Sequence, residues 1–216
     1  MKRYNGLEVP TDLVDLCEPS GMAVLVYDMQ VGICGQIGSA PTVTARCAEV
    51  LTVARKAGFR VAYTRHLSLS KAWMGVSQLR MAMAWQRKSE PAEVSPWFPR
   101  GSPAWEIVPD LAPHPDDAVF DKLAMSAFEG TPLTTALRDS GICAVALMGI
   151  ALEIGIEPTA RHAADLGFIP IIITDACGAG HHDAAERSLE SLRFAGDAVI
   201  TNVAALTALM ARSVAP

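Results

Sequence analysis

Short, continuously apolar runs recur along the chain and alternate with longer amphipathic stretches. Runs that are apolar throughout are typical of strands covered on both faces, as in a parallel sheet. Strands that alternate with helices are joined by right-handed crossovers, which predicts an α/β fold with a doubly wound, mainly parallel sheet. The predicted strands cover residues 22–27, 60–64, 118–121, 144–148, 169–174 and 198–201.

Start and stop signals for helices lie between these runs. Pro41 and Gly58 bracket one amphipathic stretch, and Gly141 and Gly167 follow two others. The predicted helices cover residues 42–57, 131–140, 158–166, 182–194 and 203–212.

Composition restricts the class of protein. With 216 residues, of which 50% are hydrophobic and 19% charged, we expect a single globular domain over residues 1–216. A net charge of -5 without a block of Lys and Arg argues against a nucleic-acid partner, and the apolar runs are too short to span a membrane. The five cysteines are scattered, which favours free thiols, and the N-terminus lacks an apolar run behind its basic residues. We therefore expect a cytoplasmic protein.

One segment interrupts the alternation of strands and helices. Residues 67–109 are rich in Met, Trp, Pro and Arg, and residues 70–88 could form a helix. The prolines at 91, 96, 99 and 103 exclude regular structure after it. Insertions this long in a compact fold are usually functional. We interpret the segment as a lid over a substrate site or as an interface between subunits.

Three polar features follow predicted strands and should meet at one edge of the sheet. Asp28 follows the first strand, Lys122 follows the run at 118–121, and the turn at 149–155 follows the strand at 144–148. In open α/β sheets, ligands bind outside the carboxyl ends of the strands. An aspartate or a lysine at a strand end is ordinary, so the case depends on all three occurring in this order.

Several motifs resemble those of the isochorismatase-like (cysteine hydrolase) superfamily over roughly residues 20–205. The matching stretches are Tyr27-Asp-Met-Gln30, Lys122-Leu-Ala-Met-Ser-Ala-Phe128, Gly149-Ile-Ala151, Thr159-Ala-Arg-His-Ala-Ala-Asp-Leu-Gly167 and Asp175-Ala-Cys177. The resemblance implies a three-layer Rossmann-like sandwich, a cofactor-free hydrolase of a small-molecule substrate, and a homo-oligomer.

The resemblance also implies roles for individual residues. Asp28 matches the acid/base aspartate, and Lys122 matches the lysine that holds charge beside it. The Ile150–Ala151 peptide matches one that is cis in relatives and turns backbone N–H groups inward. With the N–H of Gly155 these groups would form an oxyanion hole, at a helix start that favours an anion.

Gly155 stands where most relatives carry the nucleophilic cysteine. Glycine has no side chain and cannot attack a substrate. One branch of the superfamily, which cleaves the vinyl ether of isochorismate, resembles this chain in having glycine there beside Asp and Lys. That reaction needs a proton and water but no nucleophilic side chain. The leading prediction is therefore vinyl ether hydrolysis by Asp28 and Lys122.

Two other functions remain open. Glu153, Thr159-Ala-Arg161 and residues 100–109 look more like the amidase branch, which indicates hydrolysis of a small amide or ureide with water or Cys34 as nucleophile. The third possibility is a pseudoenzyme that only binds a ligand. The candidate substrate-binding residues are Gln30, Cys34, Arg65, His66, Trp105 and Glu153.

No metal site is predicted. His181 and His182 are adjacent, and neighbouring histidines on a helix project in different directions. The segment Thr64-Arg65-His66 lacks the Asp-x-His pattern with which the nicotinamidases of the superfamily bind zinc.

Overall fold

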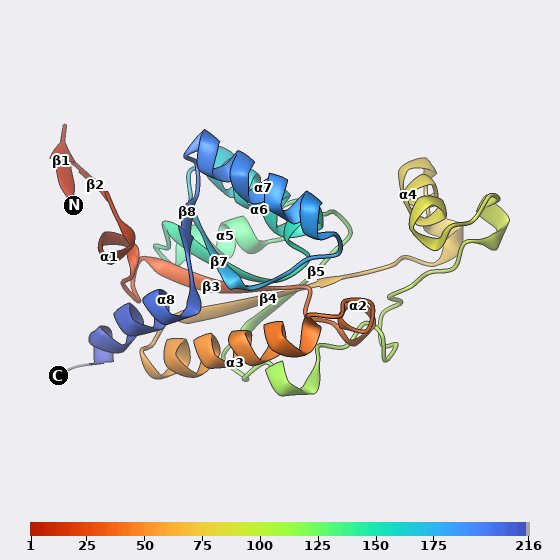
Figure 1. Ribbon diagram of the computed structural model, residues 1–216, viewed down its shortest axis with the longest axis horizontal. Helices are drawn as coiled ribbons and strands as arrows, with labels where there is room; N and C mark the ends of the chain where they lie inside the picture. The colour runs from red at the N-terminus through yellow and green to blue at the C-terminus, as the bar shows by residue number, and fades with distance from the viewer. Residues whose placement is uncertain (215–216) are drawn as a thin grey trace.

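Six parallel strands form the central sheet of the computed structural model, which describes residues 1–214; the last two residues of the predicted domain lie outside this range. The strand order is β5-β4-β3-β6-β7-β8 (Figure 1), so the chain moves outward from β3 in one direction and then returns to add β6 on its other side. The strands are β3 (Met22–Tyr27), β4 (Arg60–His66), β5 (Ala118–Lys122), β6 (Ala144–Ile150), β7 (Ile169–Gly178) and β8 (Val199–Thr201).

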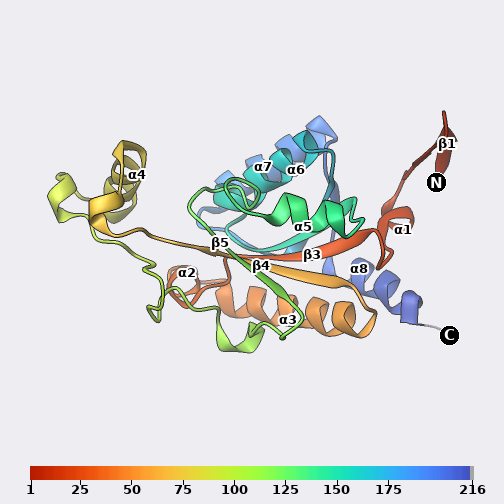
Figure 2. The same cartoon turned by 180° about the vertical axis from the view of Figure 1, so that it is seen from behind.

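Helices cover both faces of this sheet, as Figures 1 and 2 show. One face carries α3 (Ala40–Lys56) and α8 (Val203–Met210). The other carries α5 (Leu133–Asp139), α6 (Glu157–Asp165) and α7 (His182–Ala195). The predicted three-layer, doubly wound α/β sandwich is confirmed.

The continuous apolar character of β3 follows from its position between the two cores. All six of its side chains are buried. Met22, Val24 and Val26 pack on the side of α3 and α8. Ala23, Leu25 and Tyr27 pack on the side of α5, α6 and α7. Each fully buried Val or Leu contributes roughly 1.5–3 kcal/mol, so both faces of the strand hold the sandwich together.

The predicted strands are found, and four of them extend further than expected. β4, β5, β6 and β7 run to His66, Lys122, Ile150 and Gly178, past the ends of their apolar runs. Hydrogen bonds to neighbouring strands extend these elements where the side-chain pattern no longer signals a strand.

Some elements of only three or four residues, too short to show a periodic pattern, were not predicted. An antiparallel pair, β1 (Lys2–Tyr4) and β2 (Leu7–Val9), lies beside the N-terminus with every side chain exposed. The short helices α1 (Leu13–Leu16) and α2 (Val31–Cys34) follow.

Residues 67–109 form an arm that extends from the end of β4 away from the sheet (Figures 1 and 2). It contains the short 3-10 helices η1 (Lys71–Trp73) and η2 (Pro91–Glu93) and one α-helix, α4 (Val76–Gln86); a third 3-10 helix, η3 (Pro109–Leu111), begins at its last residue. The predicted helix at 70–88 is therefore shorter, because Gly75 and the left-handed Arg87 bound it. Trp73 and Val76 are almost fully exposed on the arm.

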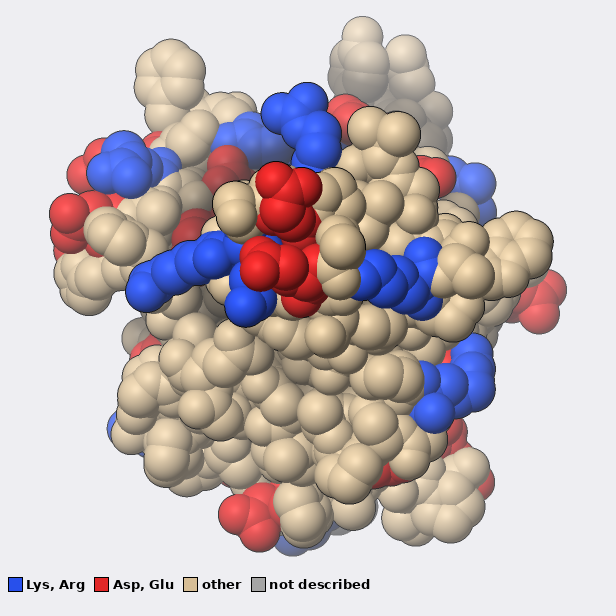
Figure 3. Space-filling view, turned by 90° about the vertical axis from the view of Figure 1, so that its right-hand side faces the viewer, with Lys and Arg blue, Asp and Glu red and all other residues tan. Residues whose placement is uncertain are grey.

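The arm end of the molecule carries charged side chains of both signs. Figure 3 shows Lys and Arg interspersed with Asp and Glu on this face rather than gathered into one block. Among the helices of residues 1–214, none combines the length and the apolar character that crossing a membrane requires.

Gly149 makes the close packing of β3 against β6 possible. Its φ is +124°, and a Cβ built there would lie 2.1 Å from the carbonyl oxygen of Tyr27. We expect Gly149→Ala to lower the free energy of unfolding by about 3 kcal/mol or more, through backbone strain and overpacking. Gly38→Ala is the control, because a Cβ at Gly38 meets nothing within 4 Å. Urea denaturation checks both, and equal losses in the two variants would contradict the explanation.

Candidate active site

Asp28 lies directly after β3, at the point in the sheet where the strand order reverses. Its backbone is left-handed, with φ +47°, and its N–H donates to the carbonyl oxygen of Thr64 at 3.2 Å. The Thr64 hydroxyl donates to Oδ1 of Asp28 at 2.7 Å. Asp28 is only 4% exposed. The carboxylate is thus fixed at the place where open α/β sheets bind ligands.

Lys122 is the last residue of β5 and reaches across β4 to Asp28. Its Nζ donates to Oδ2 of Asp28 at 2.7 Å, to Oη of Tyr27 at 2.8 Å and to the carbonyl oxygen of Ala124 at 3.2 Å. Burial lowers the pKa of Lys122, and the Asp28 carboxylate opposes that shift. Burial removes the water molecules that would solvate the Lys122 ammonium group. These three protein acceptors replace them, one for each of its N–H bonds.

The third predicted feature, the turn after β6, passes through Gly155. The Ile150–Ala151 peptide is cis. A π-helical turn, η4 (Leu152–Ile156), then leads into α6. The N–H of Gly155 donates to the carbonyl oxygen of Ala151 at 3.0 Å. The helical turn thus engages this N–H, and its expected part in an oxyanion hole stays a prediction.

Tyr27 occupies the space beside Gly155 where a side chain would project. A Cβ built on Gly155 would lie 2.0 Å from Oη of Tyr27 and 2.2 Å from its Cζ. The Tyr27 hydroxyl donates to the carbonyl oxygen of Met125 and accepts from Lys122. Burial raises the pKa of Tyr27 well above its usual value, with the neighbouring Asp28 adding to the effect.

Tyr27 was not predicted as a site residue. It is the last residue of a buried strand, and its position beside Asp28 in sequence gave no sign that it reaches Gly155. The only sequence signal is the pairing of a large residue at 27 with glycine at 155, which is meaningful only once the two are known to be neighbours.

A cavity of about 290 Å³ opens above Tyr27 and Asp28. Most of its lining is apolar, and among the described residues that line it there is no Lys, Arg or Cys. The arm contributes Trp85, Trp97 and Phe98, so it forms a wall of the cavity. The remaining lining residues are Ile33, Gln36, Ile37, His66, Met125, Ile150, Ala151, Ile154 and Gly180.

His66 lies in this cavity as an uncharged ring. Burial lowers the pKa of His66 to about 4, with the nearby Lys122 adding to the shift and Asp28 opposing it. Its ring packs edge-on against Phe98 at 5.9 Å between centroids. The predicted placement of His66 beside the substrate site agrees with this position.

Gln30 is buried and supports the site from behind the cavity lining. Its Nε2 donates to the carbonyl oxygens of His66, at 3.0 Å, and Trp105, at 2.9 Å. Its Oε1 accepts from the N–H of His66 at 2.6 Å. With all of these groups engaged, Gln30 joins the ends of β3 and β4 to the arm instead of facing a substrate.

Arg65 and Trp105 also lie away from the cavity. The Arg65 guanidinium stacks over the Trp105 ring, 3.6 Å from its centroid, and its Nε donates to Asp121 at 2.8 Å. Arg100 pairs with the same aspartate at 2.8 Å. Neither side chain lines the cavity, and Arg65 points away from Asp28 because side chains alternate along β4. The substrate contacts expected of both residues stay predictions.

Cys34 and Glu153 take other positions than expected. Cys34 lines a separate depression beside α3, and burial raises the pKa of its thiol to about 11. Glu153 accepts from the N–H groups of Gly180 and His181, both at 2.7 Å, and so holds the loop after β7 against η4. Neither side chain lines the cavity.

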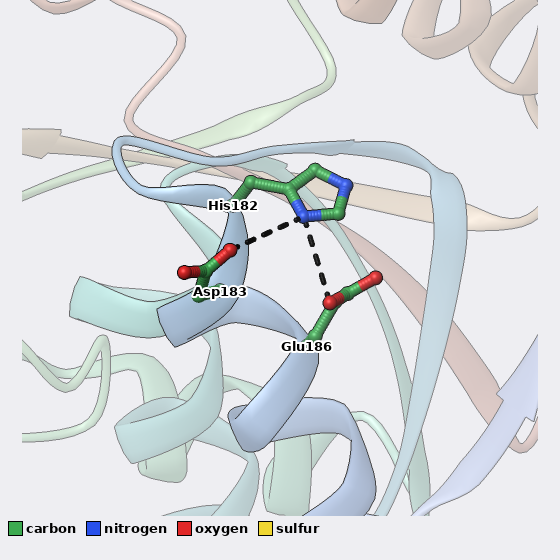
Figure 4. A group of neighbouring side chains, drawn as sticks. All are labelled: His182, Asp183 and Glu186. Atoms are coloured by element: carbon green, nitrogen blue, oxygen red, sulfur yellow. Dashed lines mark ion pairs between the residues drawn. The ribbon is translucent and has the colours of Figure 1, made fainter.

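One cluster of metal-ligating side chains is found among residues 1–214, and it lies outside the site. His182, Asp183 and Glu186 gather on the first turns of α7 (Figure 4). All three are exposed, and Nδ1 of His182 lies 3.6 Å from Glu186. Ion pairing on an exposed helix face accounts for this arrangement.

The fold and this site define an α/β protein with a buried Asp–Lys pair at the carboxyl edge of a parallel sheet. Residues 22–204 match the Isochorismatase domain, and the chain belongs to the isochorismatase family.

Known proteins resemble the chain to different extents. It is 40% identical over 84 residues to the uncharacterized isochorismatase family protein YwoC of Bacillus subtilis, a match that covers 39% of this chain and only 44% of YwoC. It is 29% identical over 179 residues to the ureidoacrylate amidohydrolase RutB of Caulobacter vibrioides, covering 74% and 77% of the two chains. A crystal structure of a cysteine hydrolase from Pseudomonas syringae superposes with a TM-score of 0.80 at 24% identity, over 92% of this chain and 96% of that one.

The uncharged His66 makes stability depend on pH. Its pKa is about 4 in the folded protein and 6.5 in the unfolded chain, so the unfolded chain binds the extra proton between these values. The contribution is fully present above pH 6.5, and about 3 kcal/mol of it is lost as pH falls toward 4. We expect His66→Asn to lose less stability than the wild type between pH 7 and pH 4.5, measured by urea denaturation. His182→Asn, at an exposed position, is the control. The prediction is contradicted if the free energy of unfolding of His66→Asn falls with pH as steeply as that of the wild type.

Proposed function

We propose that this chain is a hydrolase that cleaves a small molecule by acid–base catalysis, with water and no thiol as the nucleophile. The observation that carries the proposal is the buried ion pair of Asp28 and Lys122 beneath a cavity whose described lining residues include no cysteine. A carboxylate held in fixed geometry can take a proton from water, and a neighbouring ammonium group can stabilise developing negative charge.

The cavity favours an uncharged and largely apolar substrate. Trp85, Trp97 and Phe98 offer aromatic surface, and His66 carries no charge at neutral pH. The described lining holds no cation to pair with a carboxylate. An uncharged vinyl ether suits this environment better than isochorismate itself, although both have the bond that needs only a proton and water.

Hydrolysis of a small amide or ureide is the second candidate. Its support is the similarity to RutB over three quarters of both chains. The same Asp28–Lys122 pair would activate water in place of the absent thiol. Cys34 is a poor nucleophile for this reaction, because its thiol stays protonated at neutral pH and faces another depression.

A turnover screen on uncharged vinyl ethers, amides and ureides tests the proposal. We expect Asp28→Asn to lower kcat/KM by about 10²–10⁴-fold, because it removes the base while keeping the shape of the side chain. Cys34→Ser and treatment with iodoacetamide should leave turnover within about twofold of wild type, since the reaction uses no thiolate.

Other outcomes would decide between the alternatives. Full activity in Asp28→Asn, or loss of activity on alkylation that Cys34→Ser prevents, would contradict the proposed mechanism. Ligand-induced stabilisation without turnover of any probe would identify a pseudoenzyme.

A further inference from the structure

The phenol of Tyr27 lies where the side chain of residue 155 would project, and it contacts the same lysine that holds Asp28. A Cβ on Gly155 would fall within 2.4 Å of three Tyr27 atoms, so the present position of Tyr27 excludes any side chain at 155. Tyr27 is also 2% exposed and lines the floor of the cavity beside Asp28. It therefore has access to whatever occupies the cavity above the ion pair.

We propose that Tyr27 is a catalytic residue that takes the place of the missing cysteine and delivers a proton to the substrate. The inference rests on the proposed function, because a proton donor is useful only where a bond is hydrolysed. Its chemistry differs from that of a cysteine, since a phenol supplies a proton and forms no covalent intermediate.

Hydrogen bonds connect the three side chains that this role requires. Oδ2 of Asp28 lies 2.7 Å from Nζ of Lys122, which lies 2.8 Å from Oη of Tyr27. The Tyr27 hydroxyl donates to the carbonyl of Met125, a residue that also lines the cavity. For this role a substrate atom has to replace the Met125 carbonyl as the acceptor of the Tyr27 proton.

The proton affinities of the two donors suit a relay. Burial raises the pKa of Tyr27 well above its usual value, so the hydroxyl is protonated at neutral pH but is a weak acid, and it can give up its proton only in step with proton transfer from Lys122. Burial lowers the pKa of Lys122, which makes the ammonium group a better donor to the phenolate that forms.

Protons balance around this circuit. The oxygen of water bonds to the substrate carbon, and the proton of water passes to Asp28. Tyr27 gives its proton to the substrate, at the vinylic carbon of an ether or at the leaving nitrogen of an amide. The amide C–N bond then breaks; the hemiketal formed from the ether breaks its C–O bond as its hydroxyl proton passes to the leaving oxygen. Lys122 then reprotonates Tyr27, and Asp28 returns a proton to Lys122. One water is consumed, and the three side chains end as they began.

The steric part of the proposal is tested by melting temperatures and needs no substrate. We expect Gly155→Cys to be destabilised by collision with the phenol, and Tyr27→Ala by the cavity it leaves. The double variant Tyr27→Ala/Gly155→Cys should melt more than about 5 °C above Gly155→Cys, because the new side chain fills the vacated space. If Gly155→Cys does not fold, recovery of soluble protein in the double variant is the same result. If the drop in melting temperature of the double variant equals the sum of the drops in the two single variants, the claim that Tyr27 fills the space of a side chain at 155 is overturned.

The catalytic part is tested on the full-length protein with the substrate class found by the screen. Tyr27→Phe keeps the ring and removes the proton, so kcat should fall about 10²-fold while KM and the melting temperature change little. Replacing Tyr27 with a polyfluorinated tyrosine, whose phenol is far more acidic, should move the alkaline limb of the kcat profile to lower pH. The same analogue at Tyr63, which hydrogen-bonds Arg55 away from the cavity, is the control.

Each result has a distinct meaning. An unchanged kcat in Tyr27→Phe, or an alkaline limb that does not follow the acidity of the phenol, would overturn the role of Tyr27 while leaving the Asp28 mechanism intact. Absence of turnover for every probe would remove the proposed function and the proton donor together, and the melting temperatures would still decide which residue fills the position.

Discussion

The ion pair of Asp28 and Lys122 is the interaction on which the site depends. Two charges have been taken out of water at the carboxyl edge of the sheet, which costs several kcal/mol per ion before compensation. Thr64, Tyr27 and the carbonyl of Ala124 supply the hydrogen bonds that make this burial tolerable. The pair also joins two strands that do not touch each other, because β4 lies between β3 and β5. The ion pair can therefore form only when β3, β4 and β5 lie side by side in this order.

Much of this arrangement could be predicted from the sequence, because it depends on patterns that repeat locally. Apolar runs mark the six strands, and the order of Asp28, Lys122 and Gly155 along the chain places them at one edge. The rest depends on which way individual side chains point. Arg65 and Gln30 stand at the right edge of the sheet, yet Arg65 is held by Asp121 and Trp105, and Gln30 by His66 and Trp105; the pairing of such distant segments leaves no local signal.

The arm illustrates a second limit of sequence reasoning. Its composition indicated a lid or an interface, and the structure gives it features relevant to both. Trp85, Trp97 and Phe98 form one wall of the cavity, while Trp73 and Val76 are exposed on the same segment. The apolar cavity is thus built by two different parts of the chain: the sheet supplies charged and hydrogen-bonding groups, and the arm supplies aromatic surface.

The collision between Tyr27 and a side chain at 155 makes the two positions depend on each other. With Tyr27 in its present position only glycine fits at 155, because a Cβ there would lie 2.0 Å from Oη of Tyr27. A thiol at 155 therefore requires a change at position 27 or a shift of its ring. The residue at the turn after β6 is thus restricted by a residue at the end of β3, far away in the sequence.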